Sequence, residues 1–474
     1  MKDTTEYEAM PILQELKKVM KPAVGVLKDF DGLVRVISHY DADGIASAGI
    51  IATALIKEKK RFRLSFVKGV SPQIFQEIEH EGLVIIADMG SGQIESIRKM
   101  DATVIIIDHH ITPEIRKKKK GFENFSPEEG EKGKIFHYNT GIFGIDGGAE
   151  GCASSMSLAF VLSISEINSS LTDIALAGII GDKQDEPLTS LNREVVDMGI
   201  SMGYIQEKRP HLFLDGDSVR DALIYSVDPY LPGLTGREQK VDAFLKECGI
   251  DGTRSPEDLN PDEMRFLTDR LMLLLLKRNA TPEGIEGMVR KRYYLRRFGR
   301  YADTLSNQLN ACGRLDRMTT GVAVCLGEKT AMEKAVKIRE KYRSTLRNGL
   351  IYLESRGIRK LRNIQYFMNN DPSSSGAFAG LGMLYLFDRH MPVVALSKKE
   401  NKTHISSRGT RELVGKGLDL SDAMRYAAGK VGGSGGGHAV AAGATIPAGK
   451  EKEFLETVDE IVGKQLTSNV SMKN

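Results

Sequence analysis

The sequence predicts an α/β fold whose first domain is a doubly wound parallel sheet. From residue 33 to residue 107, β-branched apolar stretches alternate with helical patterns, and this alternation implies right-handed crossovers between parallel strands. Three of the stretches run directly into acidic residues and histidines, at 38–44, 87–88 and 108–110. Since α/β folds place their sites at the carboxyl edge of the sheet, we expect the three runs to lie together at that edge.

The sequence of the first domain predicts strands and helices that alternate along the chain. Strands are expected where β-branched apolar residues cluster, and helices in the longer stretches between them. The expected strands are 33–38, 62–67, 83–87 and 103–107, joined by helices at 44–60, 72–80 and 92–100. After a polar stretch and a glycine-rich turn, two more helices are expected at about 149–164 and 171–181, the second running into Asp182.

The rest of the chain divides into further parts. Residues 206–290 are predicted to be helical around a turn-rich interruption and carry no metal-ligand pattern, so we interpret them as an inserted domain. A charged helix at about 328–355 then connects to a smaller α/β module, with strands 364–368, 393–397 and 402–407 and helices 376–389 and 421–429. The predicted parts are a first domain (1–205), a helical insertion (206–298), a return segment with the connecting helix (299–357) and a C-terminal module (358–474).

Composition narrows the class of protein. A chain of 474 residues is too long for one compact core, and its net charge of +3 neither requires nor excludes nucleic acid as a partner. The four cysteines are dispersed without a Cys-x-x-Cys pair, which suits a reducing cytosol and offers no zinc knuckle. The polar N-terminus predicts no secretory signal, and no apolar run is long enough to span a bilayer. We therefore expect a soluble, cytoplasmic protein without membrane contact.

The residues after the first strand have the spacing of a metal site. In His39-x-Asp41-x-Asp43-Gly44 the three side chains fall on one side if the backbone stays extended. The alternative is ordinary capping of the following helix, because carboxylates favour the positive end of a helix dipole. Asp88 ends the strand 83–87 and has a similar alternative as a turn residue. Each of these patterns therefore leaves both interpretations open.

Two later runs favour the metal interpretation. Asp108-His109-His110 places adjacent imidazoles where they are hard to bury without partners, and imidazole with carboxylate suits manganese, zinc or iron. Asp182 follows an apolar helix, and an acid at the negative end of a helix indicates a nearby cation. Two ions that share a carboxylate can activate water and neutralise a phosphate. We assign His39, Asp41 and Asp88 to one ion and Asp43, Asp88, His109 and Asp182 to the other, while Asp108 and His110 would orient ligands or contact phosphate.

Two segments of the second half have the chemistry of anion binding. The glycines of 432–443 are interpreted as the opening of a helix, which would present backbone N–H groups to an anion, or else as a flexible linker. Ser406-Ser407-Arg408 offers hydroxyls and a forked cation, which suit phosphate but also suit any exposed strand. Arg314 has the same ambiguity.

A basic run interleaved with aromatic residues covers 291–300. One interpretation is a solvated helix face. The other is a track for a polynucleotide backbone, with Tyr293, Tyr294 or Phe298 stacking on bases. We favour the second because the run precedes Arg314 and accompanies the expected phosphodiester site.

Together, the acidic and histidine runs resemble the motifs of the DHH phosphoesterase superfamily. The Gly-Gly-Gly-His run, with Ser-Arg upstream, is similar to the C-terminal DHH-associated domain. The run Asn310-Ala311-Cys312-Gly313-Arg314 resembles the archaeal RecJ-like exonucleases, including the GINS-associated nuclease. The resemblance implies a processive or semi-processive exonuclease that releases mononucleotides from single-stranded DNA, or from RNA, in archaeal DNA replication or repair. It also implies two divalent ions, Mn²⁺ with Mg²⁺ or Zn²⁺ as alternatives, and docking of GINS on the insertion 206–298.

The same resemblance implies roles for single residues. Asp88, His109, His110 and Asp108 would carry catalysis. His39 stands where bacterial RecJ proteins more often carry Asp, and their added oligonucleotide-binding domain is not expected here, so cleavage polarity stays open. The implied substrate-binding residues are Asn310, Arg314, Ser406, Arg408, Gly435, Gly436, Gly437 and His438.

Three other functions share some of these features. A nano-RNase or a (cyclic) dinucleotide phosphodiesterase would use the same metal set on a very short substrate. A scaffold subunit of the replicative helicase complex would not need the complete ligand set that the sequence carries. An inorganic pyrophosphatase would need neither the insertion nor the run 310–314.

Overall fold

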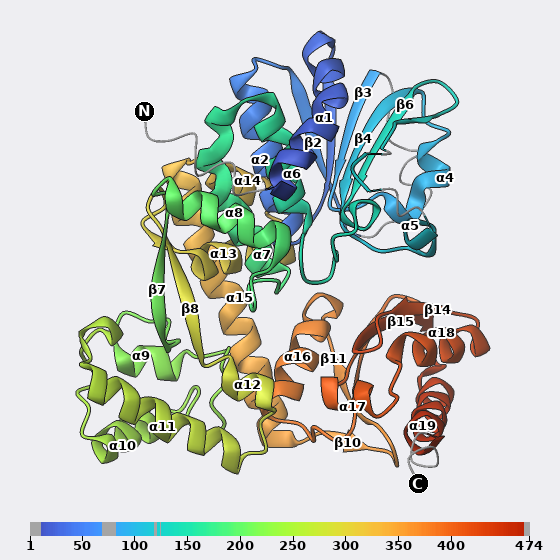
Figure 1. Cartoon of the computed structure of the whole chain (residues 1–474). Coiled ribbons are helices and arrows are strands. Elements are labelled where there is room, and N and C mark those ends of the chain that lie inside the picture. The colour runs from blue at the N-terminus through green and yellow to red at the C-terminus, as the bar shows by residue number, and fades with distance from the viewer. Residues whose placement is uncertain (1–10, 69–81, 118–120, 124, 469–474) are drawn as a thin grey trace. The chain divides into compact units, whose positions relative to one another are not determined.

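The computed structural model describes residues 11–68, 82–117, 121–123 and 125–468 (Figure 1). The chain forms two compact units. Unit 1 comprises Met1–Lys208 and Arg292–Glu340, and unit 2 comprises Arg209–Lys291 and Lys341–Asn474. No helix within the described residues is long and apolar enough to cross a membrane.

Unit 1 is built on a six-stranded sheet in the order β2-β1-β3-β4-β6-β5. Every neighbouring pair is parallel except β5 with β6, so the predicted doubly wound parallel sheet is confirmed. The strand order reverses between β1 and β3, and ligands of open α/β sheets bind outside the carboxyl ends of the strands at such a switch point. The strands are β1 (Val34–His39), β2 (Phe62–Val67), β3 (Gly82–Ala87), β4 (Ala102–Asp108), β5 (Glu128–Glu129) and β6 (Lys134–Asn139).

Helices cover both faces of this sheet. On one face, apolar side chains of β1, β3, β4 and β6 share a core with α1, α2, α6 and α7. On the other face, Ile37, Ile86 and Ile106 pack against α4, which Figure 1 shows on the side of the sheet opposite α1. The helices of unit 1 are α1 (Pro11–Asp29), α2 (Ala42–Lys57), η2 (Ser91–Gln93), α4 (Ile94–Ile97), α5 (Pro113–Lys117), η3 (Thr140–Phe143), α6 (Ala153–Ile164), η4 (Glu166–Leu171), α7 (Thr172–Gly181), α8 (Ser190–Ser201), α13 (Ala302–Arg314) and α14 (Met318–Cys325).

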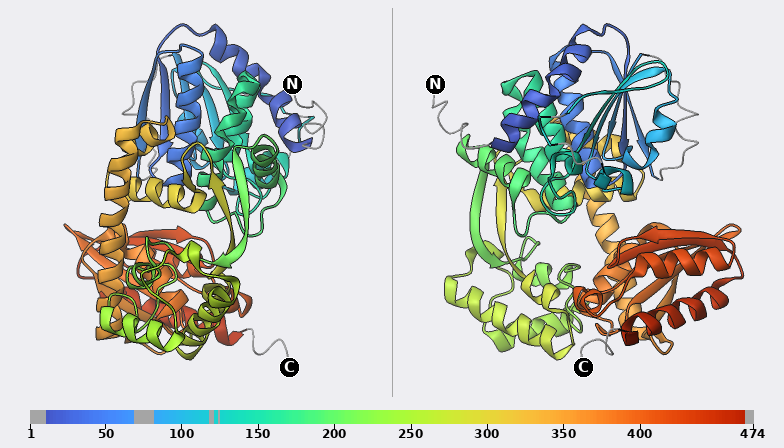
Figure 2. Two further views of the ribbon diagram at one scale, coloured as in Figure 1. Left: turned by 90° about the vertical axis from the view of Figure 1, so that its left-hand side faces the viewer. Right: turned by 45° about the vertical axis from the view of Figure 1, so that its right-hand side comes forward.

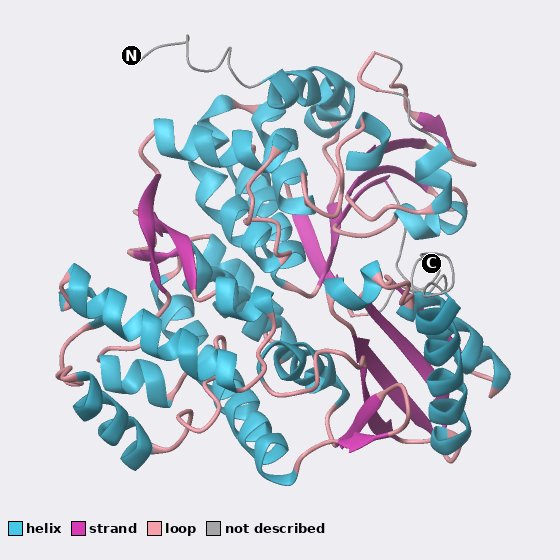
Figure 3. Ribbon diagram, turned by 60° about the horizontal axis from the view of Figure 1, so that its bottom comes forward, coloured by secondary structure: helices cyan, strands magenta, loops and turns pink. Residues whose placement is uncertain are grey.

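Three long elements continue from one unit into the other. They are strands β7 (Ile205–Leu212) and β8 (Val289–Leu295) and helix α15 (Lys329–Arg356). The strands form a three-stranded sheet with β9 (Arg300–Tyr301), and Figure 3 draws the strands in magenta. The segment between β7 and β8 is helical, with α9 (Val219–Ile224), α10 (Glu238–Cys248), η5 (Pro256–Asp258), α11 (Pro261–Lys277) and α12 (Pro282–Glu286).

The last part of unit 2 is a second six-stranded sheet, in the order β10-β11-β12-β13-β15-β14. Only β11 and β12 are parallel, and α18 and α19 share one core with this sheet (red in Figure 2, right). Its elements are β10 (Arg359–Lys360), β11 (Gln365–Asn369), α16 (Pro372–Tyr385), β12 (Val393–Lys399), β13 (Lys402–Arg408), α17 (Arg411–Gly415), α18 (Leu420–Lys430), β14 (Ser434–Gly437), β15 (Ala441–Pro447) and α19 (Glu451–Ser468).

Several local predictions are wrong. The glycines of 432–443 open no helix, because they form β14 and turn directly into β15, where Gly436 lies opposite Gly443. The basic run 291–300 is mostly strand rather than a helix face, and the helical insertion is bounded by strands. The helix expected at 92–100 is reduced to η2 and the four-residue α4. The helix expected at 72–80 lies outside the described residues.

Candidate metal centre

The carboxyl ends of three neighbouring strands and one helix supply the site. His39 ends β1, Asp88 follows β3, and His109 follows β4. Asp182 is the C-terminal cap of α7. Asp88 has a φ of 59°, a left-handed conformation that few residues other than glycine adopt and that aspartate tolerates. Such a conformation at the end of a buried strand is typical of functional positions.

The first group of possible ligands is His39, Asp41 and Asp88. The Nδ1 atom of His39 lies 2.9 Å from Asp41 Oδ2 and 3.4 Å from Asp88 Oδ2. Asp41 also caps α2, since its Oδ1 accepts a hydrogen bond of 3.0 Å from the Gly44 N–H. The side chains of His39 and Asp41 are partly exposed and that of Asp88 is buried, so the group opens to solvent on one side.

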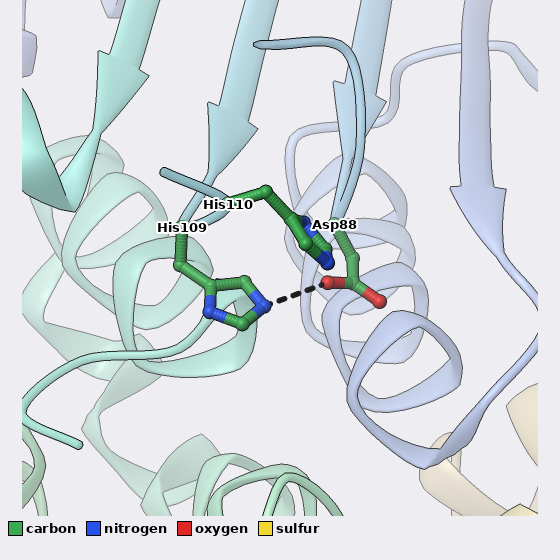
Figure 4. Close-up of side chains that lie close together, drawn as sticks. All are labelled: Asp88, His109 and His110. Carbon is green, nitrogen blue, oxygen red and sulfur yellow. Dashed lines mark ion pairs between the residues drawn. The ribbon is translucent and has the colours of Figure 1, made fainter. Parts of the chain in front are cut away.

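The second group is Asp43, His109 and Asp182. The Nε2 atom of His109 lies 3.4 Å from Asp182 Oδ2, 4.0 Å from Asp43 Oδ2 and 3.3 Å from Asp88 Oδ1. Asp88 therefore stands between the two groups, with one oxygen toward His39 and the other toward His109 (Figure 4). The six residues that the sequence assigns to metal thus lie close together in unit 1.

Buried polar atoms in this cluster would suit a cation. Asp88 Oδ2 and His109 Nε2 have almost no solvent exposure and no hydrogen-bond partner of acceptable geometry among the described residues. Leaving such atoms unpaired costs folding free energy, so native proteins nearly always satisfy them. Carboxylate oxygens and imidazole nitrogens are ligands of divalent transition metals. The residues present therefore fit one or two such ions.

The pKa values of the acids and histidines in this cluster reflect how closely their charges lie together. Burial, then repulsion by Asp88 and Asp182, raises the pKa of Asp43 to about 7. Burial and repulsion by Asp88 and Asp41 also raise the pKa of Asp182 to about 6, although His109 opposes this. Burial lowers the pKa of His39, but contacts with Asp41 and Asp88 outweigh it and raise the pKa to about 11. Without a cation, protons compensate for the clustered carboxylates, and a divalent ion would replace those protons.

Asp108 belongs to none of the groups of possible ligands, and both oxygens of its carboxylate accept hydrogen bonds from protein groups. Its Oδ1 accepts from the His109 N–H and from Nδ1 of His110, and its Oδ2 accepts from the Ser91 N–H. His110 is about half exposed and, with Asp88 and His109, forms a third group of possible ligands. Figure 4 shows both imidazoles turned toward Asp88. Asp108 thus orients His110, as the sequence allowed.

A buried polar network behind Asp108 was not predicted. The amide of Asn139 donates to Ser91 Oγ at 2.8 Å and to the His110 carbonyl at 3.0 Å. The Ser91 hydroxyl lies 2.9 Å from Nε2 of His137. Since Ser91 Oγ accepts from Asn139, its own proton is available to His137. These three residues come from η2 and β6, and no motif in the sequence connects them.

A second set of missed residues orients His109. The Nδ1 atom of His109 lies 2.6 Å from the Gly147 carbonyl, which also accepts from Gln184. Gln184 donates to Asp182 at 3.0 Å and accepts from Asn192 at 2.8 Å. A carbonyl on Nδ1 fixes the tautomer that leaves Nε2 as the ligand atom. The position of Gln184 two residues after Asp182 was the one available signal.

The sequence places two substrate-binding residues on α13, in unit 1. Arg314 ends this helix, and its Nη1 donates to the Tyr40 hydroxyl at 2.9 Å. Asn310 lies one turn earlier on the same helix. Tyr40 lies between His39 and Asp41 in the chain, so Arg314 is held beside the first group of ligands. Arg314 Nε is buried without a hydrogen-bond partner among the described residues.

The other residues predicted to bind substrate lie together in unit 2. Ser406 on β13 pairs with Gly443, which in turn pairs with Gly436 on β14. Arg408 pairs with Ala441, and His438 closes the turn between β14 and β15 through backbone hydrogen bonds to Ala441. Gly435 and Gly437 flank Gly436 on the same strand. The predicted set is therefore gathered at one end of this sheet.

The basic run 291–300 does not have the predicted form. Tyr293 and Phe298 are 4% and 5% exposed and belong to the core of unit 1, so they cannot stack on bases. Arg292 and Arg297 pair with carboxylates through two bonds each, to Asp303 and to Asp173. Residues 291–295 of the run lie in β8, where Arg292 is buried beside Tyr293 rather than exposed to a substrate.

Comparison with known proteins identifies the family. The DHH family N-terminal domain matches residues 33–179, and the DHHA1 domain matches residues 364–464. An uncharacterised protein of Methanocaldococcus jannaschii is 34% identical over 463 residues, covering 96% of this chain and 99% of that protein. The chain belongs to the DHH family.

Solved structures share the fold of this DHH-family chain at low identity. RecJ from Thermus thermophilus in complex with Mn²⁺ has a TM-score of 0.57 and 14% identity, over 96% of this chain and 55% of RecJ. The DHH-family chain thus spans about half the length of that RecJ. CDC45 from Entamoeba histolytica has a TM-score of 0.62 and 11% identity, over 95% of this chain and 99% of CDC45. The predicted RecJ-like DHH architecture is confirmed.

Proposed function

We propose that the protein is a metal-dependent phosphodiesterase that acts as an exonuclease on single-stranded nucleic acid, with DNA as the favoured substrate and RNA as the alternative. The observation that carries this proposal is the pair of ligand groups on either side of Asp88, whose buried oxygen and nitrogen atoms have no hydrogen-bond partner of acceptable geometry in the described part of the chain. His39, Asp41 and Asp88 would hold one ion, and Asp43, Asp88, His109 and Asp182 the other. Two divalent ions, Mn²⁺ in the first place, supply charge neutralisation and an activated water for phosphodiester hydrolysis.

The surrounding residues have distinct tasks in this proposal. His110 is half exposed beside Asp88, so it can donate a hydrogen bond to a substrate phosphate. Burial lowers the pKa of His110, but Asp108 outweighs it and raises the pKa to about 8, which keeps the imidazole charged near neutral pH. Asn310 and Arg314 would contact the substrate backbone from unit 1. Ser406, Arg408, Gly435, Gly436, Gly437 and His438 would do so from unit 2.

A replication partner is the second part of the proposal. The CDC45-like fold and the resemblance to the GINS-associated nuclease support a role in archaeal replication, with GINS docking on the insertion 206–298. Helix α11 in this insertion exposes Phe266, Leu273 and Leu276, which are 46%, 50% and 56% exposed. Exposed apolar side chains along one helix are typical of a protein-binding face.

End-labelled oligonucleotides test the enzymatic proposal. With Mn²⁺, the purified protein is expected to release mononucleotides from single-stranded DNA or RNA, and Asp88→Asn is expected to lower the rate by at least about 1,000-fold, because both ligand groups lose the oxygen charge they share. Asp101→Asn is the matched control, since Asp101 lies at the opposite end of β4, is exposed and pairs with Lys132. It is expected to leave the rate unchanged.

The same assay separates the alternatives. Activity confined to dinucleotides would replace the exonuclease with a nano-RNase or a dinucleotide phosphodiesterase, and release of phosphate from pyrophosphate alone would indicate a pyrophosphatase. No hydrolysis of any of these substrates, with retention by immobilised GINS, would favour a scaffold. A fully active Asp88→Asn variant would contradict the metal assignment itself.

A further inference from the structure

A hollow of about 320 Å³ lies within unit 1. Ile111 and Ile115, with Ile145, give it an apolar lining, and Gly141 lies close to the first two, so that a Cβ there would come within 2.7 Å of both. Arg116 and two carboxylates, Asp146 and Glu150, also line it. The volume is at the lower end of the roughly 300–1,000 Å³ of small-molecule sites, so it suits a single nucleoside rather than a longer segment.

The hollow is joined to the metal ligands through the backbone. Ile111 directly follows His110, whose carbonyl is held by Asn139. Asp146 directly precedes Gly147, whose carbonyl lies 2.6 Å from the ring of His109. Two residues that line the hollow are therefore chain neighbours of groups that contact or form the proposed metal site.

The two carboxylates are fixed by the loop that carries them. Asp146 Oδ1 accepts from the Gly148 N–H at 2.8 Å, and Glu150 Oε2 accepts from the Asp146 N–H at 2.9 Å. Each carboxylate uses one oxygen in this way, and a carboxylate has about four acceptor positions, so both retain capacity for a ligand. The loop thus presents hydrogen-bond acceptors at the edge of an apolar surface, with the Arg116 guanidinium as a donor.

We propose that this hollow binds the base of one substrate nucleotide and prefers guanine. Guanine presents two adjacent donors, N1–H and the N2 amino group, which match a carboxylate, while its O6 and N7 acceptors match an arginine. Uracil and thymine present a single N–H between two carbonyl oxygens, and these oxygens face the carboxylates unfavourably. The apolar lining of three isoleucines accommodates the ring itself. The inference rests on the proposed function, because only a nucleotide substrate would bring a base to this position.

Equilibrium titration calorimetry of the full chain with GMP and UMP, in EDTA, tests the proposal without any cleavage. We expect GMP to bind at least about tenfold more tightly than UMP, the discrimination of one bidentate pair. The double variant Asp146→Asn with Glu150→Gln should weaken the binding of GMP alone, so that the ratio of the two affinities falls to near one. Ile111→Ala should weaken the binding of both nucleotides. Glu131→Gln, which changes an exposed acid elsewhere in unit 1, should leave the ratio unchanged.

The outcomes separate this inference from the proposed function. Equal binding of GMP and UMP by the wild-type protein, with oligonucleotide cleavage intact, would overturn the guanine site and leave the exonuclease standing. A GMP preference that survives the double substitution would also overturn it, since the preference would then arise elsewhere. A GMP preference that the double substitution removes supports the site even if no oligonucleotide is cleaved, in which case the exonuclease alone fails.

Discussion

At the scale of single residues, capping and metal binding are not competing interpretations here. Asp41 caps α2 through the Gly44 N–H, and Asp43 accepts from the N–H groups of Ala153 and Ser154 at the start of α6. Both residues also belong to the ligand groups, since a carboxylate has enough lone pairs for both tasks. The helix N-termini therefore position the carboxylates before any ion binds.

The buried network behind Asp108 makes a prediction about stability. Ser91→Ala removes the hydroxyl that Nε2 of His137 and the amide of Asn139 both contact, so it should lower the free energy of unfolding by about 1–3 kcal/mol. Ser157→Ala is the matched control, because the Ser157 hydroxyl is equally buried and has no hydrogen-bond partner among the described residues. Urea denaturation should show little change for Ser157→Ala. Equal losses in the two variants would mean that the network adds nothing.

The Arg297–Asp173 pair predicts a pH-dependent variant. Asp173 is buried, and burial raises the pKa of its carboxyl, although Arg297 opposes this. Arg297→Met would leave a buried carboxylate unpaired and should cost about 3 kcal/mol at pH 7, the low end for buried pairs, since about a third of Arg297 is exposed. A raised pKa favours folding at low pH and loses that contribution as pH rises, so the deficit should shrink toward pH 5.

Urea midpoints at pH 5 and pH 8 measure this difference. The double variant Arg297→Met with Asp173→Asn should recover most of the stability at pH 8, because no buried charge remains to be compensated. A deficit of the same size at both pH values would show that lost packing of Arg297, whose guanidinium lies 4.4 Å from the Phe298 ring centroid, is the cause instead.

At the scale of elements, the contact of α13 with Tyr40, the residue that follows β1, depends on a glycine. A Cβ on Gly313 would come within 1.9 Å of the Tyr40 carbonyl oxygen, so Gly313→Ala should push α13 away and cost about 1–3 kcal/mol. Gly25→Ala in α1 is the matched control, since nothing lies within 4 Å of its Cβ position. That substitution should instead stabilise the protein by about 0.5–1 kcal/mol, because alanine is the better helix former. If the midpoint of thermal unfolding shifts in the same direction for both variants, the close approach of Gly313 to the Tyr40 carbonyl does not limit this position.

The elements also show where the sequence was informative. The strand ends at Asp88 and Asp108 could be located because a buried parallel strand has a continuous apolar pattern that stops where the polar residue begins. The same reasoning failed for 432–443, since glycine and alanine carry no periodicity that distinguishes a strand from a helix start. It also failed for 291–300, because a charge pattern does not show which arginines pair with a buried acid.

Contacts between segments far apart in the chain also could not be predicted from the sequence. The contact of the Gly147 carbonyl with His109 and the hydrogen bond from Asn139 to Ser91 join residues that are 38 and 48 positions apart in the chain. A backbone carbonyl has no sequence signature, and one buried serine resembles any other. The direct metal ligands could therefore be proposed from residue type and position, whereas the residues that orient them required the structure.

At the scale of the whole molecule, the ligand groups lie entirely within unit 1, so metal binding should stabilise that unit. In EDTA, stability should fall as pH rises through about 6 to 7, because the pKa values of Asp182 and Asp43 are raised to about 6 and 7 and their protons are lost in that range. Mn²⁺ should remove this loss. At one hundred times its Kd, it should add about 2.7 kcal/mol by mass action.

Hydrogen–deuterium exchange can locate this effect along the chain. Mn²⁺ should protect peptides that contain Asp41, Asp88 and His109, and should leave peptides of the second sheet, such as β12 and β13, unchanged. Asp88→Asn should be at least as stable as the wild type in EDTA, since it removes one charge from a cluster that repels itself, yet it should gain nothing from Mn²⁺. Asp101→Asn should respond to Mn²⁺ like the wild type. Protection of unit 2 alone, or an unchanged response of Asp88→Asn, would show that the ion binds elsewhere in the protein.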